Sequence, residues 1–536
     1  MVRPVTPVTL RAEDHGSVLL MFRALFGVDR HADRWMESLR ALRDPLPRLA
    51  VRGPRRCGHM QVAWWGLIPF VTMLLSIAVL PLHPVTAHHW ERPKVQAAVA
   101  LGLGLPTALW VVLAGEHALV WHALLEYAQF ITLLLSLFVV AGGLFLAGDI
   151  RATPRNNTAF LAVGGVLASF IGTTGAAMLL IRPLLNTNSE RRHKVHTMVF
   201  AIFVVANCGG LLTPLGDPPL FLGMLRGVPF TWTFSLAPEW LFVNALLLVT
   251  YYGVERRAYR DEQAADLEAD EAQQTPLGLH GRANIVWLAV IVAAVAFLPS
   301  VDVHAIESGH VGVLQLVPWR ELVMLGAAGA SYRLGDKRTR FEDNGFTWAP
   351  IVEVAALFIG IFLTMIPALR FLRQVAPSLP LGEVTFFLFS GGLSAVLDNA
   401  PTYATFFEMA SQLPGEPRVA NVPELYLTAI SLGSVLCGAI TYIGNGPNFM
   451  VKSVAENAGV TMPSFGGYVV RALRWLVPVL AAMVLVFIAD PLWCHLLGWA
   501  LAAAIATRGL LSLRLPLTPA ADDSTASAGA ERPGRR

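Results

Sequence analysis

Residues 210–220 read Gly-Leu-Leu-Thr-Pro-Leu-Gly-Asp-Pro-Pro-Leu, and they end an apolar run that is long enough to cross a membrane. Three prolines remove backbone donors and the glycines permit unwound turns, so a helix cannot continue through this stretch. A related stretch, Gly-Ala-Ile-Thr-Tyr-Ile-Gly-Asn-Gly-Pro-Asn, occupies residues 438–448. The repetition predicts two membrane helices that are broken in the same way.

Composition indicates that a bilayer is the solvent of most of the chain. Of the 536 residues, 55% are hydrophobic and 14% are charged, whereas soluble domains carry roughly 25% charged residues. The net charge of +3 and the scattered basic residues speak against nucleic-acid binding. The four cysteines show no CxxC spacing and no HExxH motif occurs, so neither a disulfide framework nor a zinc site is expected.

Long apolar runs predict eleven membrane spans, because about 20 residues cross the hydrocarbon core as a helix. The expected spans lie at about 61–82, 95–114, 123–148, 194–216, 236–254, 283–300, 319–334, 349–369, 425–449, 466–489 and 491–510. Two other apolar stretches, 157–186 and 382–412, are interrupted by Gly-Thr-Thr-Gly and Asp-Asn-Ala-Pro. Each half is too short to span, so we expect two re-entrant hairpins that each enter and leave on one face.

The two halves of the membrane region can be aligned. Three pairs of residues recur in the same order at separations of 228, 225 and 227 residues: Thr213 and Thr441, Ser169 and Ser394, Glu126 and Glu353. Five spans separate equivalent points, and an odd number inverts the second half relative to the first. We therefore predict an all-α polytopic membrane protein with two inverted repeats, each with a re-entrant hairpin and a broken transmembrane helix.

The predicted domain boundaries follow from this alignment. They are an N-terminal extension (1–59), repeat 1 (60–254), a cytoplasmic loop (255–282), repeat 2 (283–490), an extra transmembrane helix (491–515) and a disordered tail (516–536). The extension has no spanning run, so we expect it to be disordered or to reflect a true translation start at Met60. Short loops rich in Lys and Arg gather on one predicted side, which the positive-inside rule makes the cytoplasm.

The two breaks offer oxygen ligands for a cation. An interrupted membrane helix leaves N–H and C=O groups without partners, and a bound ion is one way to satisfy them. The first break supplies carbonyls, the Thr213 hydroxyl and the Asp217 carboxylate, and the second supplies the neutral side chains of Thr441, Asn445 and Asn448. A kink needed only for packing is the alternative, but a carboxylate at membrane depth is usually functional.

The hairpin tips add further candidates. These are Thr173 and Thr174 in the first hairpin and Asp398, Asn399 and Thr402 in the second. Asp398 also suits a helix N-cap, and one carboxylate can both cap a helix and bind an ion. A carboxylate that binds sodium and a proton in turn gives obligatory exchange of the two cations.

Other ionisable residues have more than one interpretation. Glu126 and Glu353 lie inside spans and are either proton carriers or structural hydrogen-bond partners. For His122, His193 and His196, near predicted membrane edges, solvation or packing is favoured over proton transfer.

At these residues the chain resembles the ion transporter superfamily, specifically the sodium/proton antiporters of the NhaD type and the related citrate transporter-like group. The likeness covers about residues 60–490 and is densest in 209–223, 394–403 and 441–449. The resemblance implies paired hairpins and unwound helices around an ion site, and a homodimer in many members. It also implies ion-binding roles for Asp217, Asp398, Asn399 and Asn445.

The chain departs from the carboxylate carriers of that superfamily, which have Ser-Asn-Thr hairpin tips. An aspartate at the second tip repels citrate unless a metal is bound with it, since like charges in a low dielectric repel by several kcal/mol (about 4 at 4 Å for an effective constant of ~20). We therefore expect a secondary transporter of the cytoplasmic membrane that exchanges sodium or lithium for protons by alternating access, without a cofactor. A cation-coupled citrate or dicarboxylate carrier is the alternative, while an enzyme or a passive channel is disfavoured.

Overall fold

The computed structural model describes residues 62–81, 84–90, 92–272, 274–301 and 317–514. The predicted N-terminal extension and disordered tail lie outside the described residues, as does a possible start at Met60. The described residues up to 374 and from 381 onward form one structural unit.

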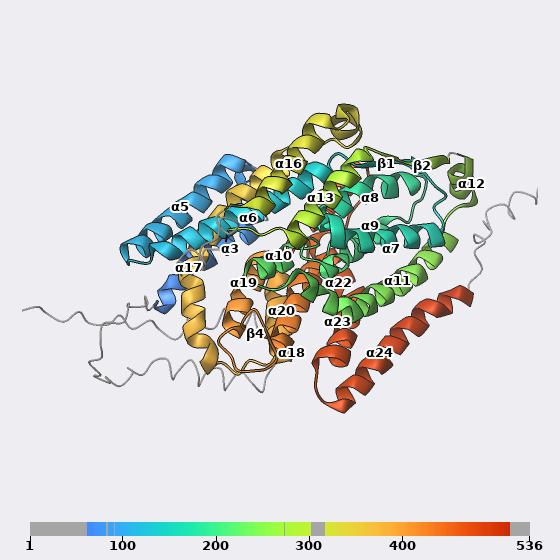
Figure 1. The fold of residues 1–536 in the computed structure, drawn as a ribbon. Coiled ribbons are helices and arrows are strands. Elements are labelled where there is room, and N and C mark those ends of the chain that lie inside the picture. Colours follow the sequence, from blue (N-terminus) through green and yellow to red (C-terminus); the bar gives the residue numbers. More distant parts are fainter. Residues whose placement is uncertain (1–61, 82–83, 91, 273, 302–316, 515–536) are drawn as a thin grey trace, which may run out of the picture. The chain divides into compact units, whose positions relative to one another are not determined.

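Helices dominate the described residues (Figure 1). Those up to residue 272 are α3 (Ile68–Val79), α4 (Pro84–Trp90), α5 (Pro93–Leu113), α6 (His117–Ala141), α7 (Pro154–Ile171), α8 (Thr173–Thr187), α9 (Val195–Val204), α10 (Pro218–Leu225), α11 (Ala237–Arg260) and α12 (Ala264–Ala272). Those that follow are α13 (Ala283–Phe297), α16 (Trp319–Leu334), α17 (Ala349–Val375), α18 (Glu383–Ser394), α19 (Asn399–Ala410), α20 (Glu424–Leu436), α21 (Gly446–Asn457), α22 (Phe465–Trp475), α23 (Val477–Met483) and α24 (Leu492–Leu510).

Short helical turns extend or connect these helices. They are the 3₁₀ turns η1 (Trp64–Leu67), η2 (Cys208–Leu212), η3 (Phe230–Leu236), η5 (Ala376–Ser378), η6 (Cys437–Ile440) and η8 (Leu511–Arg514), and the π-helical turns η4 (Arg338–Asp343) and η7 (Val484–Ile488). Two of them, η2 and η6, overlap the start of the predicted breaks.

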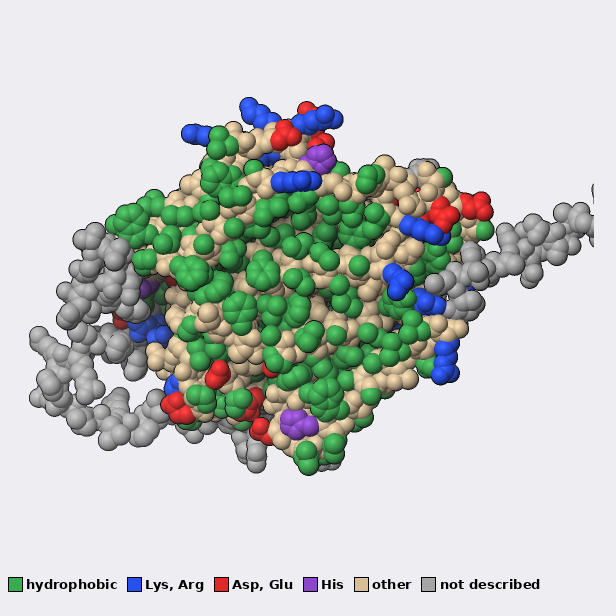
Figure 2. All heavy atoms as spheres, turned by 45° about the vertical axis from the view of Figure 1, so that its right-hand side comes forward, with side chains coloured by type: hydrophobic (Ala, Val, Ile, Leu, Met, Phe, Trp, Pro, Cys, Tyr) green, Lys and Arg blue, Asp and Glu red, His purple; other side chains and the backbone are tan. Residues whose placement is uncertain are grey.

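Seven helical segments among the described residues are long and apolar enough to cross a membrane. They are Pro93–Leu113, His117–Ala141, Val195–Leu212, Phe230–Arg260, Ala349–Ser378, Phe465–Ile488 and Leu492–Arg514. Figure 2 shows hydrophobic side chains spread over most of one face, with charged side chains toward its edges. Each predicted span coincides with a helix, so the prediction of an all-α polytopic membrane protein is confirmed.

One predicted span ends in a strand. Helix α6 stops at Ala141, and Phe145–Asp149 forms a strand, β1, instead of continuing the helix to residue 148. β1 pairs antiparallel with β2 (Thr275–His280), so that Phe145 lies opposite His280. Apolarity alone does not separate a helix end from a short strand, which is why the prediction was wrong here. A second two-stranded ribbon joins β3 (Arg418–Val419) to β4 (Val422–Pro423).

Both interrupted stretches form pairs of packed helices. Helices α7 and α8 are separated at Gly172, whose positive φ of 78° is a conformation that glycine adopts without strain. Helices α18 and α19 are separated by residues 395–398, and the Asp398 carboxylate accepts a hydrogen bond from the Ala400 N–H at 3.0 Å. The breaks lie where the sequence predicts them. Re-entry from one membrane face stays a prediction.

Both broken helices are present, and their breaks share local hydrogen bonds. The first runs from α9 through η2 to α10 and the second from α20 through η6 to α21. In each, the threonine hydroxyl accepts from the N–H two residues later at 3.2 Å, in Thr213 and Thr441 respectively. Helix α9 ends at Val204, earlier than the predicted residue 216. The inversion of one half relative to the other remains a prediction.

The loops that the sequence assigns to the cytoplasm meet one another. Asp270 accepts from the Ala152 N–H at 3.0 Å, and the carbonyl of Ala152 accepts from Arg191 at 3.2 Å. Arg182 at the end of the first hairpin donates to the carbonyl of Asp343 at 2.8 Å. Loops far apart in the sequence therefore close one end of the unit, where β1 and β2 pair.

A carboxyl group at this end predicts a pH-dependent stability. Burial raises the pKa of Asp149 from 3.8 to about 6, and the nearby carboxylates of Glu190 and Asp270 add to the rise. Its stabilising contribution is complete below about pH 4 and is lost as the pH rises through about 6. We expect Asp149→Asn to raise Tm at about pH 7.5 and to leave it unchanged near pH 4, as measured by thermal unfolding of purified protein.

Asp336 is the control for this prediction, because its pKa is shifted in the opposite direction. Hydrogen bonds from Thr339 and the N–H of Arg338 lower the pKa of the exposed Asp336. Its contribution is present above the ordinary pKa and is lost as the pH falls, so Asp336→Asn should lower Tm at neutral pH. If both substitutions changed the pH profile of Tm in the same way, the opposite pKa shifts of Asp149 and Asp336 would be contradicted.

Candidate functional site

Asp217 is the centre of the candidate ion site. Its side chain, at the N-terminus of α10, is only 1% exposed. The amide of Asn399 donates to its Oδ2 at 3.0 Å, and the amide of Asn445 lies 3.3 Å from its Oδ1. The first break, the second break and the tip of the second hairpin thus converge on one carboxylate. Three of the residues predicted from the sequence are therefore in direct contact.

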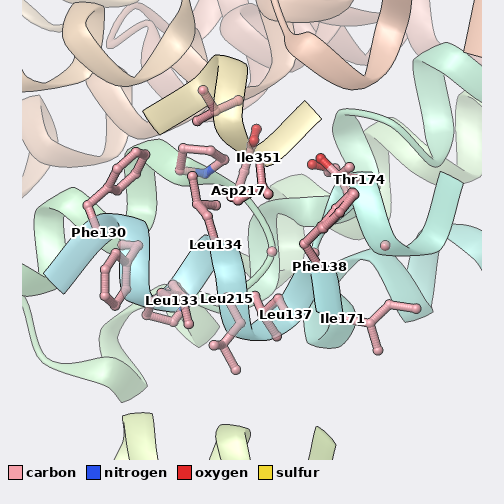
Figure 3. Close-up of a pocket in the computed structure, with 18 of the residues that line it drawn as sticks. Phe130, Leu133, Leu134, Leu137, Phe138, Ile171, Thr174, Leu215, Asp217 and Ile351 are labelled. Carbon is pink, nitrogen blue, oxygen red and sulfur yellow. The ribbon is translucent and has the colours of Figure 1, made fainter. Parts of the chain in front are cut away.

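A cavity of about 100 Å³ lies beside this carboxylate. Figure 3 shows apolar side chains of α6, among them Leu134 and Phe138, facing Asp217 and Thr174. The tip of the first hairpin (172–175), the first break (214–218) and the start of α17 also line the cavity. The Thr173 N–H donates to the carbonyl of Gly216 at 2.9 Å. Among the described lining residues, Asp217 alone has an ionisable side chain.

The cavity separates two groups of helices. Helix α6 packs with α5, α13 and α16, whereas the hairpins pack against the broken helices through α7 with η2, α8 with α21 and α10 with α19. Contacts of α6 with α8 and α10 join the groups. The lining residues come from both sides of this junction. The candidate ion site therefore lies where one helical group meets the other.

Many oxygens freed by the breaks are already occupied. The Thr213 hydroxyl donates to the carbonyl of Ser169, and the Thr441 hydroxyl donates to the carbonyl of Ala395. The carbonyl of Gly209 accepts from both Ser169 and Trp240. These contacts stabilise the unwound segments through protein donors. The break carbonyls are thus less available as ligands than the sequence suggests, and the Asp217 carboxylate becomes the more important group.

The residues of the second hairpin tip make two kinds of contact. Asp398 caps α19, and its carbonyl accepts from the Thr402 hydroxyl at 2.9 Å, so both residues shape the first turn of that helix. Neither belongs to the cavity lining, whereas their neighbour Asn399 contacts Asp217 directly. The cap interpretation of Asp398 therefore has direct structural support. An ion-binding role for Asp398 and Thr402 stays a prediction.

The two glutamates predicted as proton carriers or structural partners lie outside the cavity lining. Glu126 forms an ion pair of 3.3 Å with Arg226, whose side chain is 9% exposed and also donates to the carbonyl of Ala404. The exposed Glu353 accepts from the amide of Gln96 at 2.7 Å. The Glu126 pair connects α6 to the α10 end, which favours the structural alternative for this residue. Sequence reasoning did not identify Arg226 as its partner.

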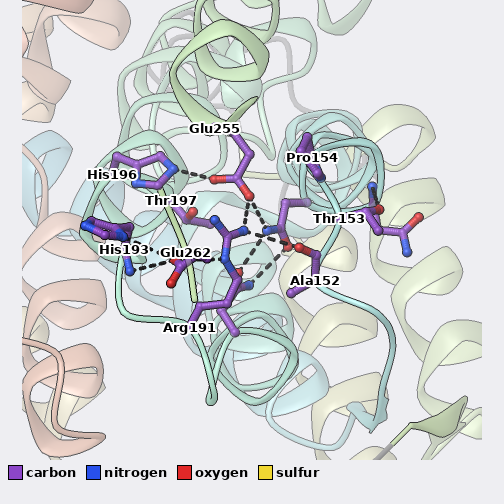
Figure 4. A network of polar contacts seen from close by, with 12 residues as sticks. Ala152, Thr153, Pro154, Arg191, His193, His196, Thr197, Glu255 and Glu262 are labelled. Atoms are coloured by element: carbon purple, nitrogen blue, oxygen red, sulfur yellow. Dashed lines mark hydrogen bonds and ion pairs between the residues drawn. The ribbon is translucent and has the colours of Figure 1, made fainter. Parts of the chain in front are cut away.

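A second buried polar cluster holds the start of α9 (Figure 4). The Glu255 carboxylate contacts both Arg191 and His196, and Arg191 also bonds Glu262 at 3.3 Å. Asn157 donates to Glu255 at 2.9 Å. Burial alone would lower the pKa of Arg191, but Glu255 and Glu262 outweigh it and raise that pKa above its usual value. The predicted packing role fits His196, through a contact with Glu255 that the sequence analysis missed.

Asn207 is a site residue that sequence reasoning overlooked. It lies in the first break, is fully buried, and its Oδ1 is 3.2 Å from the amide nitrogen of Asn445. Its own amide donates to Asn448, which brings that predicted residue into the same network. An asparagine in the middle of a membrane-spanning apolar run is costly, and this was the signal that could have identified it.

The candidate site contains one ionisable side chain among neutral groups. Within the described ranges, no three His, Cys, Asp or Glu side chains are grouped to hold a metal ion. The site instead places one carboxylate and the threonines of the first hairpin tip at the edge of a small cavity. The amides of Asn399 and Asn445 turn their N–H ends toward that carboxylate. Hard cations prefer oxygen ligands, which the carboxylate and the threonines contain.

Comparisons with known proteins agree with this architecture. The profile of a family described as "Putative citrate transport" matches residues 59–488. An "Uncharacterized transporter" of Mycobacterium bovis and one of Mycobacterium tuberculosis are each 25% identical over 323 residues, covering 58% of this chain and 71% of theirs. The "46 kDa membrane protein" of Mycobacterium leprae is 24% identical over 314 residues, covering 56% and 68%. The chain is an integral membrane transporter that belongs to the family described as "Putative citrate transport".

Proposed function

We propose that this transporter exchanges sodium or lithium for protons, with Asp217 as the site that the two cations share. The observation that carries the proposal is a single buried carboxylate at which two breaks and a hairpin tip converge. A buried carboxylate without a cation is costly in a low-dielectric environment. A proton and a sodium ion each relieve that cost, and because they compete for one charge, release of one accompanies binding of the other.

The position of the cavity supports alternating access. Asp217 faces a cavity at the junction of two helical groups, so movement of one group against the other could open the carboxylate to either side of the membrane. Thr173 and Thr174 lie at the same cavity and supply neutral oxygens for the sodium ion. We place the protein in the cytoplasmic membrane with the Lys- and Arg-rich loops inside, and propose a homodimer on the strength of the resemblance.

Citrate transport is the second candidate, and the description of the family favours it. A trianion needs compensating positive charge, yet the described lining of the cavity contains no Lys, Arg or His. The one charge in that lining, on Asp217, has the wrong sign for free citrate, and the nearby carboxylate of Asp398 has the same sign. Citrate could bind here as a complex with a metal cation, in which case Asp217 would contact the metal.

Everted membrane vesicles distinguish the two candidates. The vesicles come from a host without its own sodium/proton antiporters, are acidified by respiration, and report their internal pH through a fluorescent dye. We expect sodium or lithium chloride to alkalinise the lumen in vesicles that contain the transporter and not in empty-vector vesicles. If the vesicles take up labelled citrate and show no proton movement when sodium or lithium is added, the function is citrate transport and not cation exchange.

A further inference from the structure

We propose that Asn207 is a positioning residue that holds the amide of Asn445 with its N–H toward Asp217. This inference rests on the proposed function, because it assigns Asn207 a part in setting when Asp217 exchanges a proton for sodium. The contacts involved begin at the backbone of the second break and run through the side chains of Asn448, Asn207 and Asn445. An amide has a donor end and an acceptor end, so the orientation of one constrains the next.

The orientation of Asn448 is fixed by the backbone. Its Nδ2 lies 2.9 Å from the carbonyl of Gly438 and 2.9 Å from the carbonyl of Thr441. Carbonyl oxygens only accept hydrogen bonds, so the nitrogen end of the amide must face them. The Oδ1 of Asn448 is therefore turned toward Asn207 and requires a donor there.

Asn207 supplies that donor. Its Nδ2 lies 2.6 Å from the Oδ1 of Asn448 and 2.8 Å from the carbonyl of Ile202. Two acceptors at this end leave the Oδ1 of Asn207 at the opposite end, 3.2 Å from the Nδ2 of Asn445. An inverted Asn207 amide would place oxygen against two oxygens and nitrogen against nitrogen.

The same logic fixes Asn445. Its Nδ2 faces Asn207 Oδ1, the carbonyl of Ala206 at 3.2 Å and the carboxylate of Asp217 at 3.3 Å. All three surrounding groups are acceptors, so an N–H points at the carboxylate. Asn207, Asn445 and Asn448 are at most 4% exposed, which leaves little access for water to compensate a misoriented amide. We call these three residues the amide relay.

The amide relay affects the chemistry of Asp217. An N–H directed at a carboxylate favours its ionised form, whereas the carbonyl end of the same amide would favour the protonated form. Without Asn207, the Asn445 amide loses one of the three acceptors that hold its N–H toward the carboxylate, and the amide can turn away from Asp217. The carboxyl group would then retain its proton to a higher pH, and sodium would compete for it only at a higher pH. The relay also couples the second break to the charge in the first.

The pH profile of exchange tests this role. Sodium-dependent alkalinisation is measured in everted vesicles across a range of pH for wild type, Asn207→Leu, Asn448→Leu and the double variant. We expect each single substitution to move the pH of half-maximal exchange upward by about one unit, the effect of losing one hydrogen bond to a charged group. The double variant should show no further shift, because both substitutions interrupt the same relay.

A matched control separates positioning from general damage. Asn284 is also buried at 1% exposure and donates to two backbone carbonyls, those of Gly143 and Gly281, outside the ion site. Asn284→Leu should leave the pH of half-maximal exchange unchanged, even if it lowers the amount of folded protein. An equal shift in Asn284→Leu, an unchanged profile in Asn207→Leu, or additive shifts in the double variant would overturn the proposal.

A second readout does not depend on transport. The pH profile of Tm for purified protein in sodium-free buffer should shift upward in Asn207→Leu and not in Asn284→Leu, since protonation of Asp217 is linked to folding. Asn207→Ser is used for both measurements if the leucine variant yields no folded protein. A shifted Tm profile without any exchange in wild type would refute the proposed function and retain the relay. If the wild type exchanges sodium for protons but neither pH profile shifts in Asn207→Leu, the amide relay is refuted and the proposed function is retained.

Discussion

Replacement of Asp217 by asparagine is expected to reduce sodium-dependent proton movement by two to three orders of magnitude. An amide can neither release a proton near neutral pH nor offer a full negative charge to a cation. The attraction lost is about 4 kcal/mol for charges 4 Å apart at an effective dielectric constant of ~20, which corresponds to roughly a thousandfold in affinity. The dye assay in everted vesicles, with sodium concentration varied at constant pH, measures this loss.

Asp398→Asn is the matched control for that substitution. Asparagine caps a helix about as well as aspartate, so α19 should keep the turn in which Asp398 accepts from Ala400. We expect Asp398→Asn to lose less than about tenfold in activity, since only the charge is removed and its contacts can be retained. The comparison requires that both variants elute as folded protein in similar amounts. An intact Asp217→Asn with an inactive Asp398→Asn would move the ion site to the second hairpin.

Gly216→Ala is expected to prevent normal folding of the first break. A Cβ at this position would lie 2.0 Å from the carbonyl oxygen of Gly210, which is shorter than any tolerated contact. The obstacle is backbone, so a change of side-chain rotamer cannot remove it. Overpacking usually lowers the free energy of unfolding by about 1–3 kcal/mol, and we expect Gly216→Ala to lie at or beyond the upper end of this range. The yield of monodisperse protein and its Tm in detergent provide the measurement.

The second break contains both a graded comparison and a control. A Cβ at Gly444 would lie 2.6 Å from the carbonyl of Gly438, so Gly444→Ala should be damaging but less so. At Gly446 a Cβ would meet no atom of the described residues within 4 Å, and Gly446→Ala should be tolerated. Similar yields and Tm values for Gly216→Ala and Gly446→Ala would show that the close approach of the two glycines in the first break is absent.

Local sequence signals predicted the breaks because proline and glycine act on the backbone where they stand. Pro214 and Pro218 interrupt the backbone hydrogen bonds of a helix, Gly216 permits the unwound turn between them, and Gly172 separates the helices of the first hairpin. The convergence on Asp217 was also predictable in part. Equivalent positions in a repeat are expected to come together around a common site, as Asp217 and Asn445 do.

Other features depend on contacts that a single sequence does not display. Asn207 has no repeat-equivalent asparagine, and its role appears only through partners some 240 residues away. The pairing of Glu126 with Arg226 likewise requires the positions of two helices. Strand β1 was mistaken for the end of a helix, since its partner β2 lies beyond six intervening α-helices. Long-range partners, unlike local backbone restrictions, decide these elements.

The pairing of β1 with β2 also has a consequence for biosynthesis. A ribosome must add residues 275–280 before residues 145–149 have a partner strand, although the helices between them can already have entered the bilayer. Closure over so long a stretch of chain is an entropically costly and late event. The β1–β2 ribbon can therefore stabilise the first half of the membrane region only after its helices are in place and synthesis of the second half is about to begin.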